Sequence, residues 1–351
     1  MSCCLPRKLF NRRPRREDVY KVNEEAKDEK PGDVPQENNE APKFSWEKRE
    51  KVDPAQYTVT DIHGEFHKRV GNGNDPMQID NCSEAAIFLL KPTSSITIDD
   101  CRDCLMILGP CSGSVFIRDS SNCVILSACQ QFRTRDSHDI RIGLLCPTQP
   151  IIEQSNGVHF HPLSLNYPDF KSHMLEAGLS PFTNRVRSVH DFTPESGFKN
   201  FKIHDSIIKL TSEHLEQMTS NDIHSDIAQS ILPVFNAINM TEDSARYIVT
   251  MQEGDESKED FTDRGLTLIQ LIKTSEDVKL MSCHDIEMKQ IDRKMIPFEG
   301  KFDNLLVFQV IGNEDEMESI CKENFNLFKL VDHEQADYLK AAIQAFNAKR
   351  N

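Results

Sequence analysis

The clearest pattern in the chain is a repeat of short alternating apolar and polar runs between residues 77 and 163. Each row breaks at small polar residues. The rows read MQIDNCSEAAIFLLKPTSS, ITIDDCRDCLMILGPCSGS, VFIRDSSNCVILSACQQ, FRTRDSHDIRIGLLCPTQP and IIEQSNGVHFHPL, with starts at Met77, Ile96, Val115, Phe132 and Ile151. A period of this size without helical spacing is typical of a β-solenoid, and no leucine-rich-repeat ladder of Leu and Asn is present. We therefore expect a right-handed parallel β-helix with roughly three short strands per coil.

After the repeat the pattern changes to helical and extended segments. NYPDFKSHMLEAGLSPF predicts a helix that stops at Gly178. Further helices are expected over residues 225–240, 313–328 and 333–349, and strands over RYIVTM, GLTLIQLI and NLLVFQVIG. Alternation of strands and helices favours a smaller α/β or α+β domain. We expect three segments, namely residues 1–42 as head and linker, 43–203 as the β-helix domain and 204–351 as the α/β domain.

The beginning of the chain differs in composition from the rest. Residues 1–16 carry six Lys and Arg and no acid, although the whole chain of 351 residues has a net charge of −15. The acidic balance argues against broad nucleic-acid binding. Residues 17–42 are acidic and predict a flexible tether, whereas FSWEKREKVDPAQY predicts an ordered lead-in.

Cys3 and Cys4, next to the basic residues, suit S-palmitoylation and attraction to anionic lipid. Ser2 stands where N-myristoylation needs Gly. A solvated basic tail or a nuclear address is the alternative to this anchor. The chain has no run of membrane-spanning length and no secretory signal, so its 11 cysteines are expected to be reduced.

Cysteines of the repeat are expected to be core residues rather than metal ligands. Cys101 and Cys104 form one C-x-x-C without a second ligand pair, and Cys82 and Cys101 occupy equivalent row positions. We therefore expect no metal site. GPCSGS (109–114) lacks the Lys of a phosphate loop and fits a solenoid corner.

The stretch ACQQFRTRD (128–136) combines cationic residues with an apolar strand pattern. Alternation places Phe132 and Thr134 inward and Arg133 and Arg135 outward, and we expect Gln130 on the same outward face. A strict row alignment places Glu153 beside Thr134, and a shift of one residue places it beside Arg133 or Arg135. Spacing alone favours an ordinary surface charge ladder.

The runs ITIDDCRDCLMILGP, GSVFIRD, SACQQFRTRDS and CPTQPIIEQS closely resemble the tubulin-cofactor-C-like family. The lead-in FSWEKREKVDPAQY and the later HDFTPESG resemble its X-linked retinitis pigmentosa branch, and the similarity covers about residues 44–197. The resemblance implies a right-handed β-helix that activates a GTPase in trans. It also implies that Arg133 is the arginine finger and that Gln130 and Glu153 are further catalytic residues. Gln131, Arg135 and Phe192 are then expected on the partner-binding surface.

The branch implies an Arf-like small GTPase in its GTP form as partner, and the GTP and Mg²⁺ then belong to that partner rather than to this chain. It also implies membrane or ciliary protein transport, at the cytoplasmic face of the plasma membrane or the ciliary base. A following ferredoxin-like domain resembling nucleoside diphosphate kinase is implied, but NDIHSD (221–226) lacks that enzyme's active-site pattern, so no kinase activity is expected. A non-catalytic effector or scaffold, or a folding cofactor acting on tubulin GTP, stays an alternative.

Overall fold

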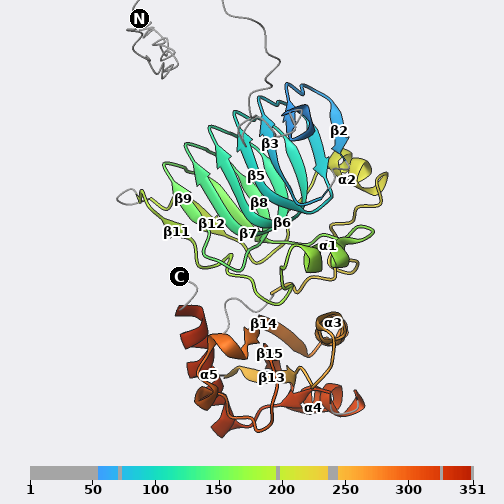
Figure 1. Cartoon of the computed structure of the whole chain (residues 1–351), viewed down its shortest axis with the longest axis vertical. Helices are drawn as coiled ribbons and strands as arrows, with labels where there is room; N and C mark the ends of the chain where they lie inside the picture. Colours follow the sequence, from blue (N-terminus) through green and yellow to red (C-terminus); the bar gives the residue numbers. More distant parts are fainter. Residues whose placement is uncertain (1–53, 70–72, 195–197, 236–243, 325–326, 349–351) are drawn as a thin grey trace, which may run out of the picture. The chain divides into compact units, whose positions relative to one another are not determined.

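The computed structural model describes residues 54–69, 73–194, 198–235, 244–324 and 327–348 (Figure 1). Cys3, Cys4 and most of the expected lead-in lie outside the described residues. A 3₁₀ turn, Pro54–Gln56, opens the described part of the chain.

Residues 58–203 contain a parallel β-helix, as the repeat predicted. Its coils are stacked side by side in the blue-to-green part of Figure 1. The strands are β1 (Thr58–Thr60), β2 (Phe66–Arg69), β3 (Asp75–Asp80), β4 (Ala86–Leu89), β5 (Thr93–Asp99), β6 (Leu105–Arg118), β7 (Val124–Arg135), β8 (Arg141–Leu145), β9 (Ile151–Glu153), β10 (Val158–Pro162), β11 (His190–Asp191) and β12 (Phe201–Ile203).

The solenoid has two faces of paired strands, and every strand pairing within it is parallel. The first face consists of β1, β3, β5, the second halves of β6 and β7, then β9 and β11. The second face consists of β2, β4, the first halves of β6 and β7, then β8, β10 and β12. Single-residue bridges, from His63–Ser83 to His138–Asn156, add a third pairing point in successive coils.

One corner of each coil is made by two residues with positive φ. Asp100 and Asp103 form it in one coil and Asp119 and Asn122 in the next, with φ between 45° and 54°. Asp and Asn tolerate this left-handed conformation better than other residues with a Cβ. The recurring Asp and Asn of the sequence rows therefore mark the corners of the β-helix.

The cysteines of the repeat are core residues, as expected. All nine cysteines of the described residues, seven of them in the solenoid, are buried and form no disulfide bond. Cys82 and Cys101 each direct Sγ to the backbone carbonyl two residues earlier. Ser120 and Ser137 do the same with Oγ one and two coils later. The small Cys and Ser side chains at this row position thus stack in successive coils at one corner of the core.

Helix α1 (Phe170–Glu176) follows the last complete coil and confirms the expected helix with its stop at Gly178, where φ is +67°. Helix α2 (Ser212–Thr219) was not predicted; its N-cap is Thr211, whose side chain accepts a hydrogen bond from the His214 backbone N–H.

The rest of the chain folds as β-α-β-β-α-β, which is the ferredoxin-like order. Its antiparallel sheet has the strand order β14-β15-β13-β16. The elements are β13 (Arg246–Met251), α3 (Lys258–Thr274), β14 (Val278–Glu287), β15 (Asn304–Gly312), α4 (Glu314–Glu323), β16 (Lys329–Leu330) and a final helix α5 (His333–Ala348), with 3₁₀ turns at Met288–Gln290 and Arg293–Met295.

Two predictions in this region were wrong. GLTLIQLI lies inside α3 rather than in a strand, because the Ser257 side chain caps a helix whose buried face includes Phe261, Leu268 and Ile272. Residues 225–235 form no helix, since Asp226 and Ser230 make local turn hydrogen bonds and Pro233 follows. The strands at 246–251 and 304–312 were correct, and the helix expected over 313–328 ends at Glu323.

Candidate functional site

The functional candidates lie on the second half of β7, where exposed and buried residues alternate. Gln131, Arg133 and Arg135 are exposed, whereas Phe132 and Thr134 are buried in the core. Phe132 packs edge-on against Phe160 at a centroid distance of 5.8 Å. The outward direction of both arginines is therefore fixed by the residues that alternate with them, as predicted.

The neighbouring coils give the two arginines different surroundings. Arg135 pairs with Arg118 on one side and Glu153 on the other. Arg118 forms an ion pair of 2.5 Å with Asp99, and Arg135 forms one of 3.2 Å with Asp136. Arg135 thus belongs to a column of charged side chains on adjacent coils, in the order Asp99, Arg118, Arg135 and Glu153.

Arg133 pairs instead with Phe116 and Ile151, both half-buried. Within the part of the chain that the structure describes, no ion pair or hydrogen bond engages the Arg133 guanidinium. The Phe116 ring is covered on one side by the Arg118 guanidinium, 5.5 Å from its centroid. An exposed cation between apolar neighbours keeps its donors available for an anion from outside.

The register between β7 and β9 departs from the strict row alignment by one residue. Ile151 lies beside Arg133 rather than Phe132, and Glu153 lies beside Arg135. The shift places Ile152 in the core behind Thr134, so that an apolar side chain keeps the inward position. Glu153 therefore shares its column with Arg135 and not with Arg133.

The structure also corrects the expected direction of Gln130. Gln131 shares the exposed face with the arginines, and Gln130 is half-buried because it has the opposite parity. The backbone carbonyl of Gln130 accepts hydrogen bonds from Thr148 Oγ1 at 2.7 Å and from Cys146 Sγ at 3.6 Å. Gln130 thus anchors the loop that joins β8 to β9.

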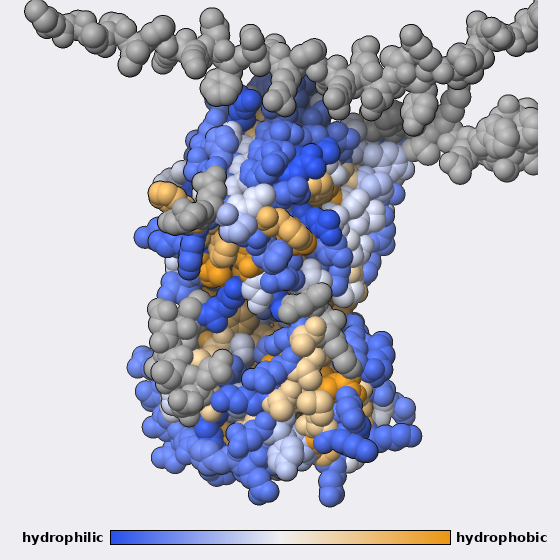
Figure 2. Space-filling model, turned by 90° about the vertical axis from the view of Figure 1, so that its left-hand side faces the viewer, coloured by the Kyte–Doolittle hydropathy of each residue, from blue (hydrophilic) through white to orange (hydrophobic). Residues whose placement is uncertain are grey.

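A groove of about 370 Å³ brings most of the partner-binding candidates together. Gln131, Arg133 and Phe192, which sequence reasoning singled out, line it. The other lining residues are Phe132, Thr148, Gln149, Ile151 and His190. The side of the molecule where β9 and β11 lie in Figure 1 carries apolar patches among hydrophilic residues (Figure 2).

Phe192 is held at this groove by the pairing of β11 with β9. Its amide donates to the Ile152 carbonyl at 2.9 Å, and its ring packs edge-on against His190 at 4.5 Å. The Asn200 side chain donates a hydrogen bond to the Asp191 carboxylate, and the Gln154 backbone N–H donates one to Thr193 Oγ1; both hold the segment. The Phe192 side chain is nevertheless 60% exposed, which is a large apolar surface left uncovered in a fixed position.

Sequence reasoning missed Thr148, Gln149 and His190 in this groove. No local pattern marks them, because they reach Arg133 only through the loop after β8 and through the pairing of β11 with β9. It also missed a cluster formed by His159, His161 and His204 on the second face of the solenoid. The H-x-H spacing of the first two on one strand was the available signal.

The part of the chain that matches a known protein family contains strands β3 to β11 and the residues that line the groove. Residues 74–192 match the family "Tubulin binding cofactor C". The chain is 40% identical over 256 residues to "Protein XRP2" of Danio rerio, across 68% of this chain and 67% of that protein. The chain belongs to the XRP2 family. It is also 38% identical to the XRP2 protein of Homo sapiens over 228 residues, covering 63% of this chain and 65% of that protein.

The XRP2 region of similarity extends beyond the part shared with cofactor C proteins. "Tubulin-specific chaperone C" of Homo sapiens is 33% identical over 69 residues, which is 20% of each chain. The solved structure "Tubulin Binding Cofactor C from Leishmania major" covers 41% of this chain and 91% of that chain, at 21% identity and a TM-score of 0.29. Among the described residues of this XRP2 homologue, no helix is long and apolar enough to cross a membrane.

Proposed function

We propose that this XRP2 homologue is a GTPase-activating protein for an Arf-like small GTPase and that Arg133 is its arginine finger. The proposal rests mainly on the position of Arg133. Its side chain is exposed between Phe116 and Ile151 and lines a groove, and it forms no ion pair or hydrogen bond with the described residues. Family membership supports the proposal.

The chemistry of GTP hydrolysis suits such a residue. Negative charge develops on the phosphate oxygens of the nucleotide as water attacks, and a guanidinium supplied in trans stabilises it, by about 10³–10⁵ in rate. The planar fork of Arg donates to two oxygens at once, which a Lys ammonium does not. GTP and Mg²⁺ are the partner's, and this chain supplies only the cation and the docking surface.

The remaining groove residues have distinct roles in the proposal. Gln131 offers an exposed amide on the same face as Arg133, and Phe192 offers an apolar anchor of the kind that dominates interface energies. Gln130 acts through the loop that it holds. Arg135 and Glu153, side by side in their own column, contribute to docking rather than to the reacting phosphate.

A membrane location is part of the proposal. Cys3 and Cys4 are the residues we propose for S-palmitoylation, with the basic residues 7–16 adding attraction to anionic lipid. In this proposal the protein acts at the cytoplasmic face of the plasma membrane or at the ciliary base and has a role in protein transport.

The test is phosphate release from a panel of GTP-loaded Arf-like GTPases and from tubulin, with and without the full-length protein. The activator proposal predicts acceleration of at least one Arf-like GTPase. Tubulin is included among the substrates because residues 74–192 match the family "Tubulin binding cofactor C". Tight binding to the GTP form without acceleration identifies a non-catalytic effector, and the absence of acceleration on every substrate contradicts the proposal.

A further inference from the structure

Three histidines meet on the outward side of the last solenoid coil. His159 and His161 lie two residues apart on β10 and therefore share one face of the strand. His204 follows β12, and its amide donates to the Phe160 carbonyl at 2.8 Å, which extends the β10–β12 pairing by one residue. Phe160 points into the core, so its pairing fixes the histidines on the opposite side.

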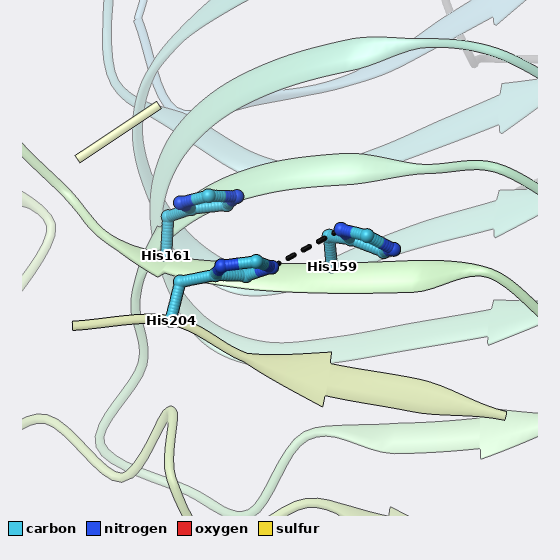
Figure 3. A group of neighbouring side chains, drawn as sticks. All are labelled: His159, His161 and His204. Atoms are coloured by element: carbon cyan, nitrogen blue, oxygen red, sulfur yellow. Dashed lines mark hydrogen bonds between the residues drawn. The ribbon is translucent and has the colours of Figure 1, made fainter. Parts of the chain in front are cut away.

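Figure 3 shows His161 and His204 stacked one above the other, with His159 directed toward His204. The first two rings are parallel within 2° at a centroid distance of 4.2 Å. His204 Nε2 and His159 Nδ1 are 3.1 Å apart, and one nitrogen of each of the three rings lies within 4.8 Å of the others. Two imidazole ligands on one tetrahedral zinc ion, each about 2.0–2.1 Å from it, are separated by roughly 3.3 Å.

The hydrogen bond of His161 to the backbone is also that of a metal ligand. His161 Nδ1 lies 2.8 Å from the Ser206 carbonyl, to which it donates, and this leaves Nε2 with the lone pair. A backbone carbonyl in this place is the usual partner that orients a metal-bound histidine.

We propose that His159, His161 and His204 bind one Zn²⁺ ion, with solvent in the fourth position. Three imidazole nitrogens and one open position form a donor set that zinc takes in proteins. Binding requires the His204 ring to turn about its Cβ–Cγ bond out of the parallel stack with His161, which keeps its hydrogen bond to the Ser206 carbonyl; such terminal torsions are broad. The ion ties β10 to β12 and so fastens the end of the solenoid.

This site is separate from the groove and does not rest on the proposed GTPase activity. Its residues lie on the second face of the β-helix, whereas Arg133 lies on the first. Arg141 and Lys202, which pair with His159 on either side, are cationic, and Asp205 lies next to His204. The imidazole donors suit Zn²⁺ and do not suit ions of the Mg²⁺ type, which prefer oxygen ligands.

The experiment is a titration of tag-free, full-length protein with Zn²⁺, in competition with a chromophoric chelator, and in parallel with Co²⁺ as a spectroscopic probe. We expect one ion per chain and the visible absorption of four-coordinate Co²⁺ without a thiolate charge-transfer band. Removal of a residue that only hydrogen-bonds to a metal ligand lowers metal affinity by about 10–100-fold. His161→Ala and His204→Ala remove a ligand itself, so each is expected to lower the Zn²⁺ affinity by more than that.

His138→Ala, which removes an exposed histidine elsewhere in the solenoid, and Cys3→Ser with Cys4→Ser are the controls, and both are expected to bind Zn²⁺ normally. His159→Ala, at a half-exposed position, gives a second variant whose fold is checked by circular dichroism and thermal unfolding. Zn²⁺ is expected to raise the unfolding midpoint of the wild type and not that of His159→Ala. Unchanged zinc affinity in folded His159→Ala and His204→Ala, or no binding by the wild type, overturns the proposal.

Discussion

Arg133 lies beside Ile151 in the pairing of β7 with β9, and this neighbour separates it from the charge column two residues further on. Arg135, on the same strand and the same face, lies beside Glu153 and pairs with Asp136. The two arginines therefore form a matched pair, of equal side chain and direction but of different surroundings, and they allow the finger to be distinguished from an ordinary surface cation.

Phe192→Ala is predicted to weaken docking of the partner without weakening the fold. The ring is 60% exposed at the groove, so its removal leaves no cavity in the core. Loss of an aromatic anchor costs about 2 kcal/mol, or roughly 30-fold in Kd, measured by titration of the GTP-loaded partner. Phe198, which is 77% exposed and does not line the groove, is the control position. Equal Kd values for Phe192→Ala and the wild type would contradict this role.

Phe132→Ala is predicted to destabilise the solenoid and to displace the finger together. Phe132 is fully buried and packs against Phe160, and truncation of such a ring costs about 3–5 kcal/mol. Denaturant unfolding measures the loss, and Phe132→Leu is expected to recover most of it. A loss below about 1 kcal/mol for Phe132→Ala would show that this residue does not hold β7 in place.

Acidification is predicted to destabilise the protein through His173. Burial, and then the nearby Lys91, lower the pKa of His173 below its ordinary value of 6.5. The unfolded chain therefore takes up the proton first, so stability is complete above pH 6.5 and falls as the pH drops through the folded-state pKa. The pKa values of His161, His204 and His214 are lowered as well, so these residues also contribute to the loss of stability in acid.

His173→Gln is expected to reduce this slope, because an uncharged amide takes up no proton and can still donate to the Tyr167 hydroxyl, which lies 3.1 Å from His173 Nδ1. Unfolding free energies of the wild type and His173→Gln across the acid range measure the slope. An identical slope in wild type and His173→Gln would show that His173 titrates as it does in the unfolded chain.

Cys3→Ser with Cys4→Ser is predicted to move the protein from the membrane fraction of cells to the soluble one. One basic segment without acyl chains gives only weak, salt-sensitive attraction to lipid. Ser2→Ala is the control, since Ser2 accepts no myristoyl chain in any case. Membrane attachment that persists in the double variant would point to another anchor.

Much of the fold could be predicted because the solenoid repeats its own pattern. Met77, Ile96, Val115 and Phe132 are indeed aligned in successive coils, and the stacked Cys and Ser positions were visible in the rows. The strict row alignment placed Ile151 beside Phe132, whereas it lies beside Arg133. The loop that enters β9 is anchored by the hydrogen bond between Gln130 and Thr148, and no residue pattern predicts how far this loop extends. The strand expected at GLTLIQLI failed because a dense apolar run fits a buried helix as well as a strand.

The candidate site was predicted only in part. Parity gave the outward direction of Arg133 and Arg135 from residues on one strand, and the family resemblance supplied Phe192. The contrast between Ile151 and Glu153 as neighbours of the arginines, the pairing of His190 with Ile151, and the meeting of His204 with His159 all depend on pairing between distant segments. Such pairings are properties of the folded chain and not of any local stretch.

The most direct test of the account is single-turnover GTP hydrolysis by the Arf-like GTPase that the protein accelerates, with wild type, Arg133→Ala, Arg133→Lys and Arg135→Ala. The account predicts that Arg133→Ala loses about 10³-fold or more of the acceleration while still binding the GTP form, and that Arg133→Lys recovers little of it. Arg135→Ala is expected to change the affinity alone. Full acceleration by folded Arg133→Ala, or equal losses in Arg133→Ala and Arg135→Ala, would contradict the assignment of Arg133 as the finger.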